Sequence, residues 1–189
     1  MNHRYLQKFQ IKDVVFLAIM SAVALATCAV MPLVISLQPL IFGISQLVTA
    51  LQIGVFFAIG PYKVRKPGSL LIMALMMGLI QLMMSPPMFL SSVLNGVLIE
   101  LIVLLLFRGY EKDAAVFVAA MLHTPLSLPF NYLYNRLVKG TDSPLAAVAD
   151  RAPLAAVGMT LAVVAVSALG ALIGIKIARE LKKSGVLKK

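Results

Sequence analysis

The chain has 189 residues, of which 61% are hydrophobic and 13% are charged. Soluble domains carry about 45–50% apolar and about 25% charged residues, so this composition excludes a water-soluble enzyme and indicates an integral membrane protein. The 17 Lys and Arg against 7 Asp and Glu give a formal net charge of +10. These basic residues lie in short segments between apolar runs, where they interact with anionic lipid headgroups and set the orientation of the helices in the membrane. Nucleic acid is therefore not expected as a partner.

Six apolar runs follow one another along the chain, and most are long enough to cross a bilayer as helices. We therefore predict an all-α protein, a bundle of six transmembrane helices forming a single membrane domain over 1–189. The first run is about twice as long as a signal-peptide core of 7–15 residues, so we expect it to be retained. Prolines and glycines separate the later runs. The predicted helices span about 14–36, 40–60, 69–84, 88–107, 114–136 and 154–178.

Basic residues concentrate on one side of this six-helix arrangement. Fourteen Lys and Arg fall in the terminal segments and the even-numbered connections, whereas only Arg136, Lys139 and Arg151 fall on the other side. The positive-inside rule then places both termini in the cytoplasm. We expect a multi-pass protein of the cell membrane, whose odd-numbered connections face the exterior.

Polar residues gather in the outer half of the predicted bundle. Asn95 lies in the outer half of the fourth helix, and Gln81 ends the third helix at a similar depth. Four polar residues of the fifth helix are spaced by four and so share one face: His123, Ser127, Asn131 and Asn135. Unpaired polar groups are costly in hydrocarbon. We therefore predict an outward-facing pocket, over the alternative that these groups only hold helices together.

The fifth predicted helix also contains Pro125 and Pro129. Each proline removes a backbone donor and frees a carbonyl four residues earlier. Interrupted helices at membrane depth are tolerated where they line a cavity, and the sequence leaves open whether this helix is broken. Tyr132, in the same stretch, offers a ring face to a planar or cationic solute.

Glu100 is the only acidic residue well inside a predicted span, where a carboxylate costs about 2.5–3.5 kcal/mol. Three roles are open for it: a counter-charge for a cationic ligand, a partner of His123, or a protonated structural donor. Our candidate substrate-binding residues are Asn95, Glu100, His123, Asn131, Tyr132 and Gln81.

Two predicted helices carry small residues at helical spacing, which lets another helix approach closely. These stripes are Ala18, Ala22 and Ala26 in the first helix and Gly170, Gly174 and Ala178 in the last. One stripe could serve internal packing and the other an external partner, and periodicity does not say which.

The sequence lacks common nucleotide-binding and catalytic motifs. It contains no phosphate-binding glycine loop, no His-Glu-x-x-His and no Gly-x-Ser-x-Gly, and His3, His123 and Cys28 cannot form a conventional metal site. We therefore expect neither catalysis nor a resident metal or cofactor. Active transport would need an ion gradient or a separate ATPase.

The pattern resembles the substrate-binding S components of energy-coupling factor (ECF) transporters. It shares with them the six helices, the cytoplasmic termini, the alanine series in the first helix and the outward pocket. The stretches Val64-Arg65-Lys66-Pro67-Gly68 and Asn95-Gly96-x-x-x-Glu100 are similar to S components associated with thiamin or its hydroxymethylpyrimidine precursor.

The resemblance implies a division of labour. This subunit would capture a vitamin-like solute from outside, and a transmembrane coupling subunit with two cytoplasmic ATPase subunits would drive its release inside. It also implies that Ala18, Ala22 and Ala26 dock on the coupling subunit. The alternative is a stand-alone secondary transporter or small channel, in which Glu100 and His123 would relay protons.

Overall fold

The protein is described from a computed structural model, which covers residues 8–30, 33–34, 36–140 and 143–185. All the regular structure in these ranges is helical: α1 (Ile11–Thr27), α3 (Ile44–Val64), α4 (Ser69–Leu82), α5 (Pro86–Phe107), α6 (Asp113–Val138), α7 (Pro144–Arg151) and α8 (Pro153–Lys183). Helices α3, α5, α6 and α8 are long and apolar enough to cross a membrane, and α4 is a shorter apolar helix. The predicted all-α membrane class is therefore confirmed for the described residues.

The largest differences from the helix bounds expected from the sequence concern two segments. Helix α1 ends at Thr27, well before the predicted end near residue 36, because the chain turns where the Cys28 N–H donates to the Leu25 carbonyl. The short helix α7 was not predicted. Pro144 supplies the preorganised first turn of α7, and eight residues are too few to span a bilayer.

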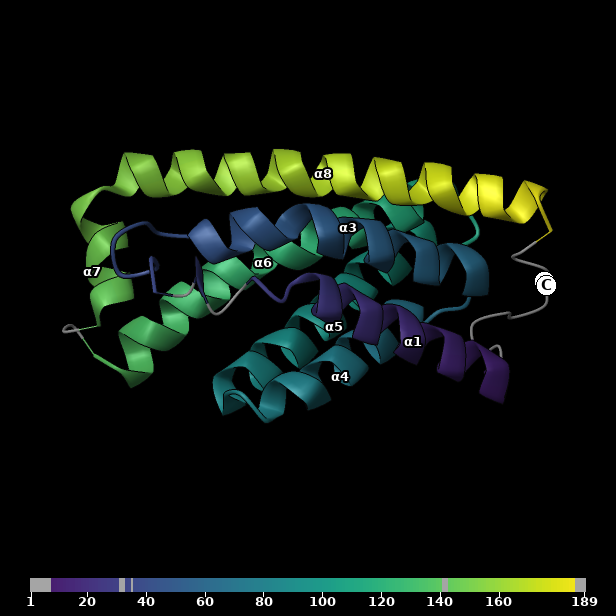
Figure 1. Ribbon diagram of the computed structural model, residues 1–189, viewed down its shortest axis with the longest axis horizontal. Coiled ribbons are helices and arrows are strands. Elements are labelled where there is room, and N and C mark those ends of the chain that lie inside the picture. The colour runs from purple at the N-terminus through teal and green to yellow at the C-terminus, as the bar shows by residue number, and fades with distance from the viewer. Residues whose placement is uncertain (1–7, 31–32, 35, 141–142, 186–189) are drawn as a thin grey trace.

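Helix α3 is the centre of the bundle. It packs against α1, α4, α6 and α8, and in Figure 1 it lies beside α8, with α1, α4 and α5 on its other side. Its residue Phe57 is fully buried in a core that also holds Leu17 from α1, Met73 from α4 and Ile99 from α5. This packing holds the helices that surround the candidate site.

The glycine stripe of α8 allows that helix to touch α3 backbone to backbone. A Cβ atom at Gly170 would lie 2.4 Å from the Leu51 carbonyl oxygen, and one at Gly174 would lie 2.4 Å from that of Val55. No side chain fits at such a distance, so only glycine permits this approach. Of the two small-residue stripes, the one on α8 serves internal packing.

Helix α6 continues through both of its prolines, from Asp113 to Val138. Pro125 has no N–H for the Met121 carbonyl, and the Ser167 hydroxyl of α8 donates to that oxygen instead, at 2.8 Å. A neighbouring helix therefore satisfies the freed carbonyl, and the helix does not need to break.

The two ends of the bundle differ in chemistry. We call the end with the start of α1 and the end of α8 the terminal end; it lies at the right in Figure 1. There, Arg65 and Arg179 both pair with the Asp113 carboxylate, at 2.5 and 2.6 Å, and tie α3 and α8 to α6. Lys66 pairs with Asp13 of α1 at 2.6 Å. The opposite end, at α7, is the pocket end.

Candidate functional site

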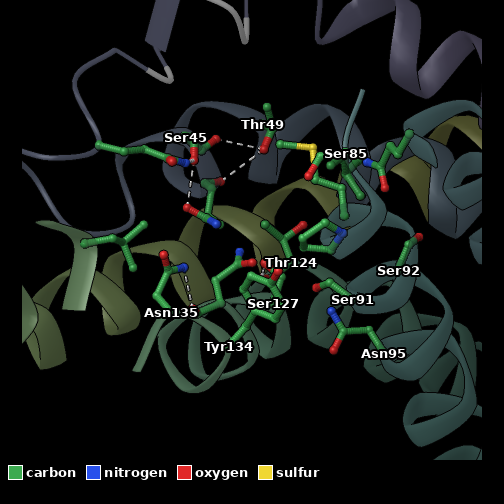
Figure 2. Close-up of a pocket in the computed structure, with 18 of the residues that line it drawn as sticks. Ser45, Thr49, Ser85, Ser91, Ser92, Asn95, Thr124, Ser127, Tyr134 and Asn135 are labelled. Atoms are coloured by element: carbon green, nitrogen blue, oxygen red, sulfur yellow. Dashed lines mark hydrogen bonds between the residues drawn. The ribbon is translucent and has the colours of Figure 1, made fainter. Parts of the chain in front are cut away.

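A cavity of about 420 Å³ lies at the pocket end, within the 300–1,000 Å³ range of small-molecule sites. In Figure 2, Ser45 and Thr49 of α3 face Thr124 and Ser127 of α6 across it, and Asn95 of α5 lies to one side. Neutral polar side chains dominate the lining, which consists of Gln38, Pro39, Ser45, Gln46, Thr49, Ile53, Met77, Gln81, Ser85, Pro87, Met88, Ser91, Ser92, Asn95, His123, Thr124, Ser127, Asn131, Tyr134, Asn135, Lys139, Ser143, Pro144 and Leu145.

The tertiary structure brings four of the six candidate binding residues to this cavity: Asn95, His123, Asn131 and Gln81. They come from three helices and from distant parts of the chain. Asn95 and His123 are almost completely buried, with 1% and 5% of their surface exposed. Their role in binding a solute stays a prediction, but their convergence on one cavity is a property of the fold.

Glu100 is not among the residues that line the cavity, and its assignment as a binding residue stays a prediction. It is five residues further along α5 than Asn95, a rise of about 7.5 Å toward the terminal end. Its Oε1 accepts a hydrogen bond from the Gly68 N–H at 2.5 Å, and its Oε2 accepts one from the Tyr110 hydroxyl at 2.9 Å. A carboxylate is favourable at the N-terminus of a helix, here that of α4. Glu100 therefore joins α5 to α4 and to the 108–112 connection.

Tyr110 completes this arrangement from the 108–112 connection. Its ring is fully buried. Burial and the nearby Glu100 carboxylate raise the pKa of the Tyr110 phenol well above its ordinary value. The phenol therefore stays protonated and remains a hydrogen-bond donor to Glu100.

Tyr132 also lies away from the cavity lining. Its hydroxyl donates to Asp150 Oδ1 at 2.7 Å, and Arg136 pairs with Asp150 Oδ2 at 2.7 Å. Both contacts fasten α7 to α6. Tyr134 lines the cavity instead, because residues two apart point to nearly opposite sides of a helix.

Three residues of the lining have buried polar atoms that lack partners within the described part of the chain. These are Asn95 Oδ1, both ring nitrogens of His123, and Thr124 Oγ1. Phe57 packs on the His123 ring, with centroids 4.2 Å apart and planes tilted by 45°. A buried polar atom without a hydrogen bond costs about 1–3 kcal/mol. These atoms belong to residues that line the cavity, but they are themselves buried behind its surface.

Two lining residues of α3, Ser45 and Thr49, were not predicted from the sequence. Ser45 and Thr49 face the cavity, the Ser45 hydroxyl donates to Gln46 Oε1 at 2.8 Å, and Gln38 Nε2 donates to Ser45 Oγ. The spacing of Ser45 and Thr49, four residues apart on an apolar helix, is the signal that would have found them. Across the described ranges, no three His, Cys, Asp or Glu side chains are grouped to hold a metal ion.

The alanine stripe of α1 lies on the surface, apart from the cavity. Ala22 and Ala26 are exposed and Ala18 is half-buried. Their neighbour Ile19 keeps 52% of its surface exposed. This face of α1 is thus apolar and not covered by the described residues.

Comparisons with known proteins agree with this architecture. A solved structure described as "Crystal structure of an S-component of ECF transporter" matches 95% of this chain and 89% of its own, with a TM-score of 0.65 and 21% identity. This likeness shows a shared fold. No curated protein matches the sequence. A family model described as "Hypothetical bacterial integral membrane protein (Trep_Strep)" matches residues 11–183. The chain is therefore a multi-pass integral membrane protein and belongs to the Trep_Strep family.

Proposed function

We propose that this protein is the substrate-capture subunit of an ECF-type importer, which binds a small vitamin-like solute from outside and delivers it inward. The observation that carries the proposal is the cavity at the pocket end, which is lined mainly by neutral polar side chains, Asn95 and His123 among them. The fold shared with an S component supports it.

The proposal includes an orientation in the membrane, with six spans and both termini in the cytoplasm. Its support is the distribution of basic residues, which concentrate at the terminal end, as the positive-inside rule requires of a cytoplasmic side. The pocket end then faces the exterior. The cavity is placed to receive a solute from outside.

The proposed partners are a transmembrane coupling subunit and two cytoplasmic ATPase subunits. The chain has no nucleotide-binding motif of its own. The α8 glycine stripe is used inside the bundle, whereas Ala22 and Ala26 of α1 are exposed. We assign the docking surface to Ala18, Ala22 and Ala26, where small side chains allow a partner helix to approach closely.

The alternative of a stand-alone secondary transporter receives less support. A proton relay between Glu100 and His123 would need hydrogen bonds that connect the two side chains. The two Glu100 oxygens instead accept hydrogen bonds from Gly68 and Tyr110. The tertiary structure gives Glu100 a role in holding the fold.

The experiment is co-purification from native membranes, with solute binding measured in parallel. The tagged protein is expected to bring down a coupling subunit and ATPases, and Ala22→Leu is expected to reduce that recovery at least tenfold. Ala162→Leu on α8, another exposed alanine, is the matched control and should change neither partner recovery nor unfolding temperature.

Two results would contradict the proposal. One is uptake by the purified protein alone in liposomes, driven by an ion gradient. The other is wild-type protein that recovers no ATPase and binds no small solute. Equal loss of partner and solute in Ala22→Leu would indicate misfolding, and the unfolding temperature in detergent identifies that case.

A further inference from the structure

The acidic side chains of the described residues all lie away from the cavity. Asp13, Asp113, Asp150 and Glu180 are paired with Lys or Arg, Glu100 is held by Gly68 and Tyr110, and Glu111 is exposed in the 108–112 connection. None of them is among the residues that line the cavity. A cation entering this site would lose its hydration without meeting a carboxylate, which is costly.

Aromatic side chains do not compensate for this missing charge. A cation can bind over the faces of Trp, Tyr or Phe, but Tyr134 is the only such residue among those lining the cavity. The sole formally charged side chain of the lining is Lys139, which is exposed and repels cations. The described wall of the cavity is therefore unsuited to a positively charged solute.

The polar groups of the lining include both donors and acceptors of hydrogen bonds. Apart from Lys139 and His123, they are the amides of Asn and Gln, the hydroxyls of Ser and Thr, and the phenol of Tyr134, each of which can donate and accept. None of these groups carries a formal charge, so the lining matches a solute that is itself uncharged and carries both a donor and an acceptor.

We propose that the cavity binds an uncharged polar small molecule that carries both a hydrogen-bond donor and an acceptor, as in an amide, a lactam or an amino-substituted heterocycle. Asn95 and His123 line the cavity, and Ser45 and Thr49 of α3 line it from the side of α3. The inference rests on the proposed function and narrows it: permanently cationic vitamins such as thiamin are excluded as substrates.

The test is capture of small molecules by the purified, full-length protein in lipid nanodiscs. The nanodiscs are incubated with a low-molecular-weight extract of bacterial cells and washed, and the bound compounds are released and identified by mass spectrometry. The wild-type protein is expected to enrich a compound that is uncharged at pH 7 and carries both a donor and an acceptor. Asn95→Leu and His123→Leu should each reduce that enrichment at least tenfold while retaining the wild-type unfolding temperature.

Charge variants decide between the possible classes of solute. Lys139→Gln is expected to leave enrichment unchanged, and its loss would point to an anion and overturn the proposal. Asp142 lies outside the described residues, so Asp142→Asn is included; its expected effect is also nil, and loss of capture would indicate a counter-charge for a cation. Enrichment of a permanent cation by wild-type protein would overturn the proposal directly.

The failure of this inference can be told apart from failure of the proposed function. If a cation or an anion is captured, the protein still binds a substrate and only the substrate class is wrong. If nothing is enriched, the capture function itself fails, and the inference fails with it. As a direct probe, thiamin is expected to leave the unfolding temperature of the wild-type protein unchanged, and a rise that Asn95→Leu removes would overturn the proposal.

Discussion

The two ends of the bundle differ in whether their buried polar groups have hydrogen-bond partners. At the terminal end, the Glu100 carboxylate accepts hydrogen bonds from Gly68 and Tyr110, and the arginines pair with Asp113. At the pocket end, Asn95 and His123 have polar atoms for which the described residues provide no partner. The difference separates polar residues that join parts of the fold from polar residues that line the cavity and have unpartnered atoms.

This difference matters because the two kinds of residue look alike in the sequence. Glu100 and Asn95 stand five residues apart on the same helix, and both are buried, at 6% and 1% exposure. Burial therefore does not distinguish them. The presence or absence of internal hydrogen-bond partners does, and it predicts opposite consequences of substitution at the two positions.

The largest effect is expected from Glu100→Leu. This change leaves the half-buried Gly68 N–H and the buried Tyr110 hydroxyl without the Glu100 acceptor, at a cost of up to about 1–3 kcal/mol for each unsatisfied group. The unfolding temperature in detergent should fall by many degrees. Glu111→Gln, at an exposed acid of the neighbouring connection, is the control and should have no effect. A stable Glu100→Leu protein that lost only solute binding would return Glu100 to the binding site.

Arg65→Met should give the next largest loss of stability, about 2 kcal/mol. The Arg65 guanidinium donates to the carbonyls of Tyr110 and Glu111 and pairs with Asp113, so it joins the end of α3 to the start of α6.

Arg108→Met is the matched control for Arg65→Met. Arg108 also follows a helix in the left-handed region, with φ of 59° against 53° for Arg65, but no hydrogen bond of its side chain is observed within the described ranges. Both variants are compared by thermal unfolding. Equal losses in the two would show that backbone conformation, and not the hydrogen bonds, sets the cost.

Asn95→Leu is expected to leave stability unchanged or slightly raised. The substitution removes a buried acceptor that has no partner among the described residues, and with it a desolvation cost of about 1–3 kcal/mol. Thermal unfolding of the protein without added solute is the measurement. A marked loss of stability would mean that Asn95 holds the fold as Glu100 does, and the contrast between the two ends would disappear.

Asp150→Asn should have the smallest effect. Its ion pair with Arg136 joins side chains that are 36% and 44% exposed, and such exposed pairs contribute little. The amide can still accept the hydrogen bond from Tyr132. We expect no resolvable change in unfolding temperature, and a large drop would show that α7 is integral to the stability of the pocket end.

Much of the candidate site could be predicted because polar residues in an apolar helix stand out. Asn95, His123, Asn131 and Gln81 were found in this way, and all four line the cavity. Glu100 stood out by the same criterion and lies elsewhere. Its partners, the Gly68 backbone and the Tyr110 hydroxyl, are 32 and 10 residues away in the chain, and no local pattern reveals such contacts.

Tyr132 and the two small-residue stripes show the same limit. The Tyr132 hydroxyl donates to Asp150, which lies on α7, and α7 was not predicted from the sequence. The spacing of the small residues predicted close approach on both α1 and α8. Only packing showed that Gly170 and Gly174 meet the backbone of α3 while Ala22 stays exposed.

The sequence by itself determined the membrane class, the helical composition and the presence of polar residues within apolar helices. These follow from composition and periodicity, because each helix must satisfy its own backbone in lipid. The tertiary structure alone decided which polar groups satisfy one another and which face the cavity. That choice depends on contacts between residues far apart in the chain, since hydrogen bonds form only where packing brings a donor to an acceptor.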